Sequence, residues 1–185
     1  MIKPIMKSEF FLRLPSEDAG PDDAATGQDL LDTLHEHEHE CVGLAANMIG
    51  VRKRIICVKD GNRALLMYNP QILEQVNAYQ TSEGCLSLIG ERPCTRYRRI
   101  KVEYLDENFV HRIKNFSGYT AEIIQHEIDH CNGVVSRIHA NLTFNFEGAT
   151  RRSAPSHFTS PWRKCGSLAV VCLSCDASIL AAADT

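Results

Sequence analysis

The sequence predicts one soluble domain that combines α-helices with β-strands. The chain has 185 residues, of which 44% are apolar and 23% charged, a composition typical of a globular protein with its own hydrophobic core. Short segments that are rich in β-branched residues or alternate apolar and polar positions indicate strands. One longer segment near residue 125 has the apolar periodicity of a helix. Disorder, collagen and coiled coil are excluded as the main architecture.

The first helix is expected over residues 24–38, after an N-terminal arm. Prolines and a glycine interrupt the first 23 residues, which favours an extended arm that ends in a turn. Leucines at positions 30, 31 and 34 mark one face of the helix, and Asp22 or Asp23 can cap it. Near its end, His35 and His39 lie one helical turn apart. We expect a solvated helix end there rather than a metal site, because no third ligand is fixed beside them.

Strands are expected in the middle of the chain. Small residues dominate positions 42–50, so this segment can bring its backbone close to another element. Residues 54–59 and 65–68 are apolar runs, and residues 98–105 alternate apolar and polar positions. Asp-Glu-Asn at 106–108 favours a hairpin turn that leads into residues 109–113.

The second helix is expected over residues 117–131, with Ser117 as its N-cap and Asn-Gly at 132–133 as its stop. One face of this helix carries Tyr119, Ile123, His126, Glu127 and His130. A second face is apolar, and the polar third face carries only Glu122, Gln125, Asp129 and Asn132. Such a helix is buried over most of its circumference. Because burying two histidines and a glutamate is costly, a divalent cation is the expected compensator.

Residues 126–130, His-Glu-Ile-Asp-His, fit the pattern H-E-x-x-H, in which two histidines one turn apart ligate a metal and the glutamate handles protons. A catalytic site of this kind needs a third protein ligand and an open position. Downstream, Cys131 points the wrong way, and His139 and His157 are remote. The better candidate is Cys85, in the Glu-Gly-Cys-Leu-Ser loop at 83–87.

Three segments together resemble the signature motifs of peptide deformylases, in order and approximate spacing. They are Val-Gly-Leu-Ala-Ala at 42–46, Glu-Gly-Cys-Leu-Ser at 83–87 and Gln-His-Glu-Ile-Asp-His at 125–130. The resemblance covers roughly residues 28–135 and implies an α+β fold, with antiparallel β-sheets around a central C-terminal helix that carries H-E-x-x-H. We therefore expect a catalytic domain over residues 1–138 and an atypical tail of unknown role over residues 139–185.

The resemblance also implies a metal-dependent hydrolase that removes the formyl group from the N-terminal formyl-methionine of nascent polypeptides and releases formate. Cys85, His126 and His130 would hold Fe(II), with Zn(II), Ni(II) or Co(II) as replacements and water in the fourth position. A metal of this kind makes hydroxide available at neutral pH. Glu127 would take the proton of the water and deliver it to the leaving nitrogen.

For the substrate, the resemblance implies two backbone contacts and an apolar pocket. The backbone N–H of Leu86 would donate to the oxyanion, and Gly43 would form backbone hydrogen bonds with the extended substrate. Val42, Tyr119 and Ile123 are candidates for the pocket of the methionine side chain. Packing in the protein core is an equally open interpretation for these three residues.

The first motif departs from the family pattern at Met48. Most members have glutamine there, whose side chain donates a hydrogen bond to the formyl oxygen, and methionine cannot donate. Losing one such donor typically costs about 10²- to 10³-fold in rate. Asn47 lies one position early and on another side of the chain, so we do not expect it to substitute. The alternative function is therefore a catalytically weakened or inactive metal-binding homologue that binds peptide or ribosomal partners.

A third interpretation, a metalloprotease, rests on H-E-x-x-H alone and is weakened by the upstream Cys85. The partners expected are N-formylmethionyl nascent peptides, with the ribosome left open. The net charge of -3 provides no overall basic field, so neither direct nucleic-acid binding nor membrane binding is expected. Because neither a signal-peptide core nor a long apolar span is evident, we expect a cytoplasmic protein.

The sequence also suggests two supporting interactions and one further cysteine cluster. Glu83 can pair with Arg96 to hold the Cys85 loop, and Asp129 can brace a neighbouring strand, although plain surface ion pairs are an even alternative. Cys172 and Cys175 have C-x-x-C spacing and could form a zinc site with Cys165. Packing or exposure is the favoured interpretation of that cluster, since no matching second pair follows.

Overall fold

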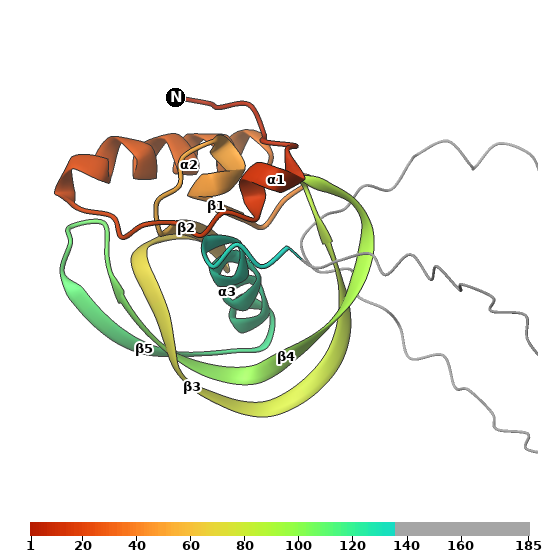
Figure 1. Ribbon diagram of the computed structural model, residues 1–185. Coiled ribbons are helices and arrows are strands. Elements are labelled where there is room, and N and C mark those ends of the chain that lie inside the picture. Colours follow the sequence, from red (N-terminus) through yellow and green to blue (C-terminus); the bar gives the residue numbers. More distant parts are fainter. Residues whose placement is uncertain (136–185) are drawn as a thin grey trace, which may run out of the picture.

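The computed structural model describes residues 1–135, apart from the side chains of residues 89–92. Three α-helices and five strands follow one another along this part of the chain (Figure 1). The helices are α1 (Glu9–Leu12), α2 (Ala24–Glu36) and α3 (Gly118–Cys131). The strands are β1 (Gly43–Ala45), β2 (Ile55–Asp60), β3 (Arg63–Cys85), β4 (Leu88–Leu105) and β5 (His111–Ser117). Short 3₁₀ helices span Pro21–Asp23 and Ala46–Ile49.

The strands form one antiparallel sheet in the order β1-β2-β3-β4-β5. The long strands β3 and β4 bend strongly and, with β5, wrap around α3, while α1 and α2 lie beyond β1 and β2 (Figure 1). Register shifts interrupt the β3–β4 ladder at three places, between Tyr68 and Gln71, between Ile72 and Glu74, and at its end between Glu83 and Cys85. Such irregularities increase local bending and twist, which lets one sheet enclose a helix.

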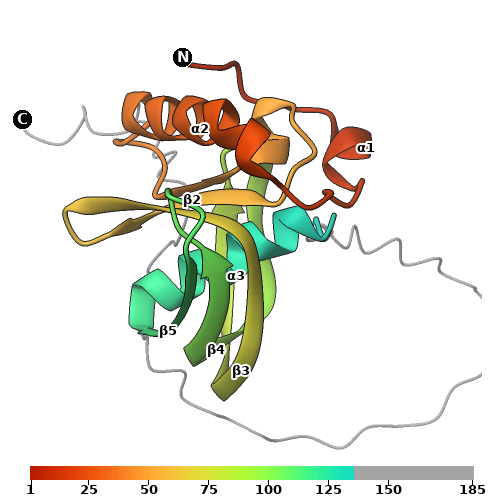
Figure 2. The same cartoon turned by 90° about the vertical axis from the view of Figure 1, so that its left-hand side faces the viewer.

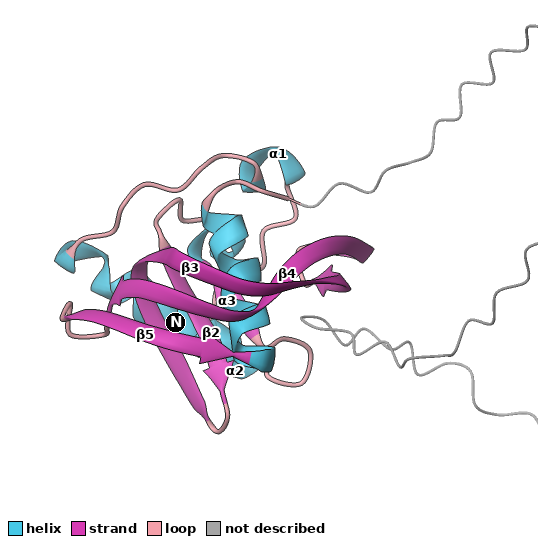
Figure 3. Cartoon of the chain, turned by 90° about the horizontal axis from the view of Figure 1, so that it is seen from below, coloured by secondary structure: helices cyan, strands magenta, loops and turns pink. Residues whose placement is uncertain are grey.

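Helix α3 lies in the centre of the described domain. Seen from another side it crosses behind the sheet of β3, β4 and β5 (Figure 2), and from below these strands run across it (Figure 3). Its residues Ile123 and Ile124 are fully buried. On the polar face Glu122 and Gln125 are buried as well, whereas Asn132 is exposed. Gln125 accepts the Tyr97 N–H and donates to the Tyr97 carbonyl, both at 2.9 Å, so its amide attaches α3 to β4.

The predicted α+β class is confirmed, and the helix expected over 117–131 is α3. The strands expected at 65–68 and 98–105 are parts of the much longer β3 and β4. The expected strands are too short because the outer segments of β3 and β4 carry charged, exposed residues that hide the apolar pattern of a strand. The expected domain boundary at 138, the tail and the cluster of Cys165, Cys172 and Cys175 lie outside the described residues. In the part that the structure describes, no helix is long and apolar enough to cross a membrane.

Candidate metal centre

Strand β3 and helix α3 bring together three side chains of the kinds that ligate metals. Cys85 ends β3, and His126 and His130 lie one turn apart on α3. One ligand atom from each of the three lies within 4.8 Å of the others, and the Cys85 Sγ is 3.3 Å from the His130 Nε2. All three residues are buried. They are the only group of at least three such residues, within residues 1–135, that could hold a metal ion.

The chemistry of these donors fits a divalent transition metal. The Nδ1 of His126 lies 2.9 Å from the Glu83 Oε2, so a proton on Nδ1 leaves Nε2 as a lone-pair donor. That Nε2 is buried and has no hydrogen-bond partner among the described residues. A buried nitrogen with no partner is costly unless a ligand satisfies it. One thiolate with two imidazoles is a donor set suited to zinc, iron and related metals.

The electrostatic surroundings of Cys85 favour its thiolate form. Burial by itself would raise the pKa of this thiol, but contacts with His126 and His130 outweigh burial and hold the pKa well below its usual value. A thiolate, not a thiol, is the form that ligates metals. Two other buried cysteines contrast with it: burial raises the pKa of Cys57 and of Cys131 to about 12.

A chain of buried charges holds His126. Arg96, on β4, donates two hydrogen bonds to the Glu83 carboxylate, at 2.8 and 2.7 Å, and one to the Asp129 Oδ2 at 2.6 Å. Burial would raise the pKa of Glu83, but Arg96 and His126 lower it to about 2. The ion pair of Glu83 and Arg96 is therefore a buried link from β4 to His126, and Asp129 braces that strand through the same guanidinium.

Glu127 lies beside this cluster. It is fully buried, and both carboxylate oxygens lack a hydrogen-bond partner among the described residues. Burial raises the pKa of Glu127 to about 7, against the opposing influence of His126 and His130. An acid poised near neutrality in a buried site can both accept and donate a proton at physiological pH.

Gly43 on β1 has no side chain, and this leaves room for the carboxylate of Glu127. A Cβ at position 43 would lie 2.6 Å from the Glu127 Oε1 and 2.6 Å from the Ile123 Cγ2, closer than real Cβ contacts come. The backbone of β1 thus passes directly over the carboxylate. From the sequence only a backbone role is expected for Gly43, because a glycine in a run of small residues does not reveal which residue lies opposite it.

The backbone groups of Gly43 face away from the rest of the sheet. β1 is an edge strand, and Gly43 is opposite Val58 of β2. The neighbouring pair is joined by the bond from the Lys59 N–H to the Val42 carbonyl at 2.8 Å. Because hydrogen-bonded and non-hydrogen-bonded pairs alternate in an antiparallel ladder, the N–H and carbonyl of Gly43 point outward. The Cys41 Sγ donates to that carbonyl at 2.6 Å.

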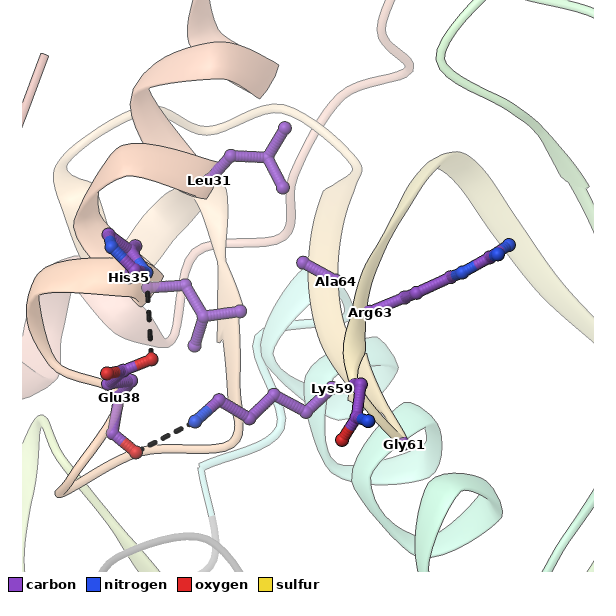
Figure 4. A pocket seen from close by; sticks show the side chains of 9 residues that line it. Leu31, His35, Glu38, Lys59, Gly61, Arg63 and Ala64 are labelled. Atoms are coloured by element: carbon purple, nitrogen blue, oxygen red, sulfur yellow. Dashed lines mark hydrogen bonds and ion pairs between the residues drawn. The ribbon is translucent and has the colours of Figure 1, made fainter.

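A separate cavity of about 350 Å³ lies between the end of α2 and the turn joining β2 to β3 (Figure 4). Lys59 donates to the Glu38 carbonyl at 2.8 Å at this place. His35 and His39 are exposed and lie within 3.8 Å of the Glu38 carboxylate. This agrees with the expected solvated helix end. None of the residues that line the cavity belongs to the cluster of Cys85, His126 and His130.

Comparison with known proteins assigns the family. A family model for polypeptide deformylase matches residues 7–142. The chain belongs to the peptide deformylase family. It is 51% identical to a peptide deformylase of Clostridium beijerinckii over 135 residues, which are 73% of this chain and 99% of that protein. It is 39% identical to peptide deformylase 1 of Clostridium perfringens over 111 residues, 58% of this chain and 74% of that protein.

Solved peptide deformylases share the fold. A class I type b peptide deformylase of Acinetobacter baumannii with bound Met-Ala-Ser superposes with a TM-score of 0.67 at 28% identity, over 74% of this chain and 97% of that one. The peptide deformylase of Thermotoga maritima gives a TM-score of 0.67 at 29% identity, over 73% and 95% of the two chains. The resemblance seen in the three motifs is confirmed.

Membership of the peptide deformylase family defines the reaction. The protein is a metal-dependent hydrolase that removes the formyl group from the N-terminal methionine of nascent polypeptides. The metalloprotease interpretation, which depended on five residues, is overturned by this assignment.

The remaining deformylase candidates differ in burial, and two of them are placed by direct contacts, Ile123 against Gly43 and Asn47 at the end of α3. Ile123 is buried against Gly43, Val42 is half-buried, and Tyr119 is half-exposed. Met48 is fully buried. The Asn47 amide donates to the His130 carbonyl at 2.7 Å, so its nitrogen is already engaged at the end of α3. Asn47 therefore supports the last turn of α3 at His130, a role that no pattern in the sequence indicates.

Proposed function

We propose that Cys85, His126 and His130 hold the catalytic cation of this deformylase and that Glu127 carries the proton during hydrolysis. One observation supports the assignment above all: three convergent buried donors lie next to a buried carboxylate that has no partner among the described residues. The metal proposed is Fe(II), with Zn(II), Ni(II) or Co(II) as replacements. When bound, such a cation lowers the pKa of a water and polarises a carbonyl oxygen.

Glu127 serves both halves of the reaction. As a base it accepts a proton from the water that attacks the formyl carbon, and as an acid it gives that proton to the nitrogen of the breaking C–N bond. Formate and a free amine result. Its raised pKa, about 7, supports this exchange because neither protonation state is strongly favoured at neutral pH. Glu83 and Arg96 keep the His126 ring in one orientation meanwhile.

The substrate is proposed to lie along the free edge of β1. An extended peptide pairs with the outward N–H and carbonyl of Gly43 as an added strand. This alignment runs past Glu127, which lies directly under Gly43. The Leu86 N–H, one residue after Cys85, is the proposed donor to the oxyanion. Val42, Tyr119 and Ile123 are proposed to line the methionine pocket, with Met48 beside the formyl group in place of a donor.

The cellular location and the partner of the protein are proposed from its nascent-chain substrate. We assign the protein to the cytoplasm, with the ribosome as a transient partner because formylated chains emerge there. The proposed catalytic domain covers residues 1–138, and residues 139–185 are proposed as an atypical tail of unknown role.

The test is formate release from formyl-Met-Ala-Ser by protein loaded with Fe(II) without oxygen. Cys85→Ser and His126→Ala are expected to lose the metal, measured by elemental analysis, because each removes one of three ligands. Glu127→Ala is expected to keep the metal and lose turnover. A Glu127→Ala protein with full activity would exclude this mechanism. Bound metal without formate release by the unmodified protein would instead favour the inactive homologue suggested by Met48.

A further inference from the structure

The N-terminal arm connects two of the segments that form the site. The Met6 N–H donates to the Met48 carbonyl at 2.8 Å, and the next residue, Lys7, donates from its Nζ to the Leu86 carbonyl. Met48 lies in the 3₁₀ helix that continues the first motif, and Leu86 belongs to the second motif. Two consecutive residues of the arm therefore contact both segments.

Several contacts fix the arm after Lys7, so that its side chain starts from a defined place. Ser8 caps α1 through a bond from the Phe11 N–H to its hydroxyl at 3.4 Å. Beyond α1, the Ser16 N–H donates to the Cys131 carbonyl at 2.8 Å, at the end of α3. Gly133 packs so closely on this stretch that a Cβ there would lie 2.4 Å from the Arg13 carbonyl oxygen. The arm is thus docked on the same helix that carries the histidines.

The contact at Leu86 matters for catalysis because of what Leu86 is proposed to do. Its backbone N–H is the proposed oxyanion donor, and its carbonyl accepts a hydrogen bond from the ammonium of Lys7. A charge-assisted hydrogen bond restricts the rotation of this backbone segment more than a neutral bond does. This carbonyl and the proposed oxyanion donor belong to the same residue, so the bond places the positive charge of Lys7 within one residue of that donor. A positive charge there would offset part of the loss at Met48, which cannot donate a hydrogen bond.

We propose that Lys7 is a positioning residue of deformylation in this protein: its ammonium holds the Leu86 carbonyl, orients the Leu86 N–H and partly compensates for the donor missing at Met48. The proposal rests on the proposed role of Leu86. It differs from the assigned roles because Lys7 lies outside all three signature segments and acts through the backbone of another residue.

The experiment compares Lys7→Met, Lys7→Arg and Lys3→Met in Fe(II)-loaded full-length protein at low salt. Lys3 lies on the same arm, but its Nζ pairs with Asp29 at 3.1 Å, so Lys3→Met is the matched control. Lys7→Met is expected to lower kcat about 3- to 10-fold on formyl-Met-Ala-Ser. KM and metal content should change less than about twofold, and Lys7→Arg should regain most of the loss, because it restores the charge and the donors.

A second measurement does not depend on activity. The ¹³C chemical shift of the Leu86 carbonyl is expected to move in Lys7→Met and to stay unchanged in Lys3→Met. The role of Lys7 would be overturned if Lys7→Met left the Leu86 signal or kcat unchanged. It would also be overturned if Lys7→Arg did not repair the loss of kcat, or if Lys3→Met showed the same loss. Failure of the unmodified protein to release formate would refute the catalytic assignment and the compensation together. Failure confined to the Lys7 variants leaves the catalytic assignment standing.

Discussion

The close approach of Gly43 to Glu127 makes Gly43→Ala the most direct probe of the site. The added methyl carbon would lie 2.6 Å from the Glu127 Oε1 and 2.6 Å from the Ile123 Cγ2. An ordinary van der Waals contact needs at least 3.4 Å, so each atom has to retreat by about 0.8 Å. Both belong to α3. Either the helix moves away from β1 or the carboxylate rotates out of its place.

The size of the effect follows from these displacements. Inserting a methyl group into a packed interior typically costs about 1–3 kcal/mol in the free energy of unfolding. Misplacing a reacting group by about 1 Å costs on the order of 10²-fold in rate. We therefore expect Gly43→Ala to lower kcat about 100-fold. The metal content should remain near one equivalent, because the three atoms nearest to the new methyl group belong to Glu127 and Ile123 and not to the ligands Cys85, His126 and His130.

The assay is formate release, with metal content and denaturant unfolding measured on the same preparation. Gly20→Ala is the matched control: it adds the same atom where nothing lies within 4 Å, at a backbone conformation that alanine adopts freely. It should change kcat less than twofold. If Gly43→Ala keeps kcat within about threefold of the unmodified protein, the carboxylate does not act from the position under Gly43, and the reasoning from its burial fails.

Two further substitutions test the surroundings of the site. Met48→Gln is expected to raise kcat about 10-fold or more by restoring a donor, while lowering the free energy of unfolding by about 1–3 kcal/mol because it buries an amide. An unchanged rate would mean that position 48 does not face the oxyanion. Arg96→Met should weaken metal affinity about 10- to 100-fold by releasing Glu83 and thus His126, as measured by competition with a chelator; unaltered affinity would show that the ion pair does not orient the ring.

The sequence predicted the inward-facing histidines of α3 because helical periodicity fixes which residues share a face. It could not place Cys85 against them by physics alone. That contact depends on the curvature of β3 and β4. The strands bend at register shifts, which the local sequence pattern does not predict. The motif resemblance supplied this information instead. The buried state of Glu83 and Arg96 was equally hidden, since a charged pair in a sequence is compatible with either surface or interior.

The buried charges around His126 are better explained by orientation than by stability. Taking the Arg96 guanidinium and the Glu83 carboxylate out of water costs free energy that their mutual attraction only partly returns, and apolar residues of the same size would often serve stability as well. What apolar residues could not do is hold one proton on the Nδ1 of His126. Glu83 does so at 2.9 Å, and Arg96 holds Glu83 from the opposite strand with a bidentate bond. The lone pair on Nε2 is thereby aimed at the place where the Cys85 thiolate and the second imidazole converge.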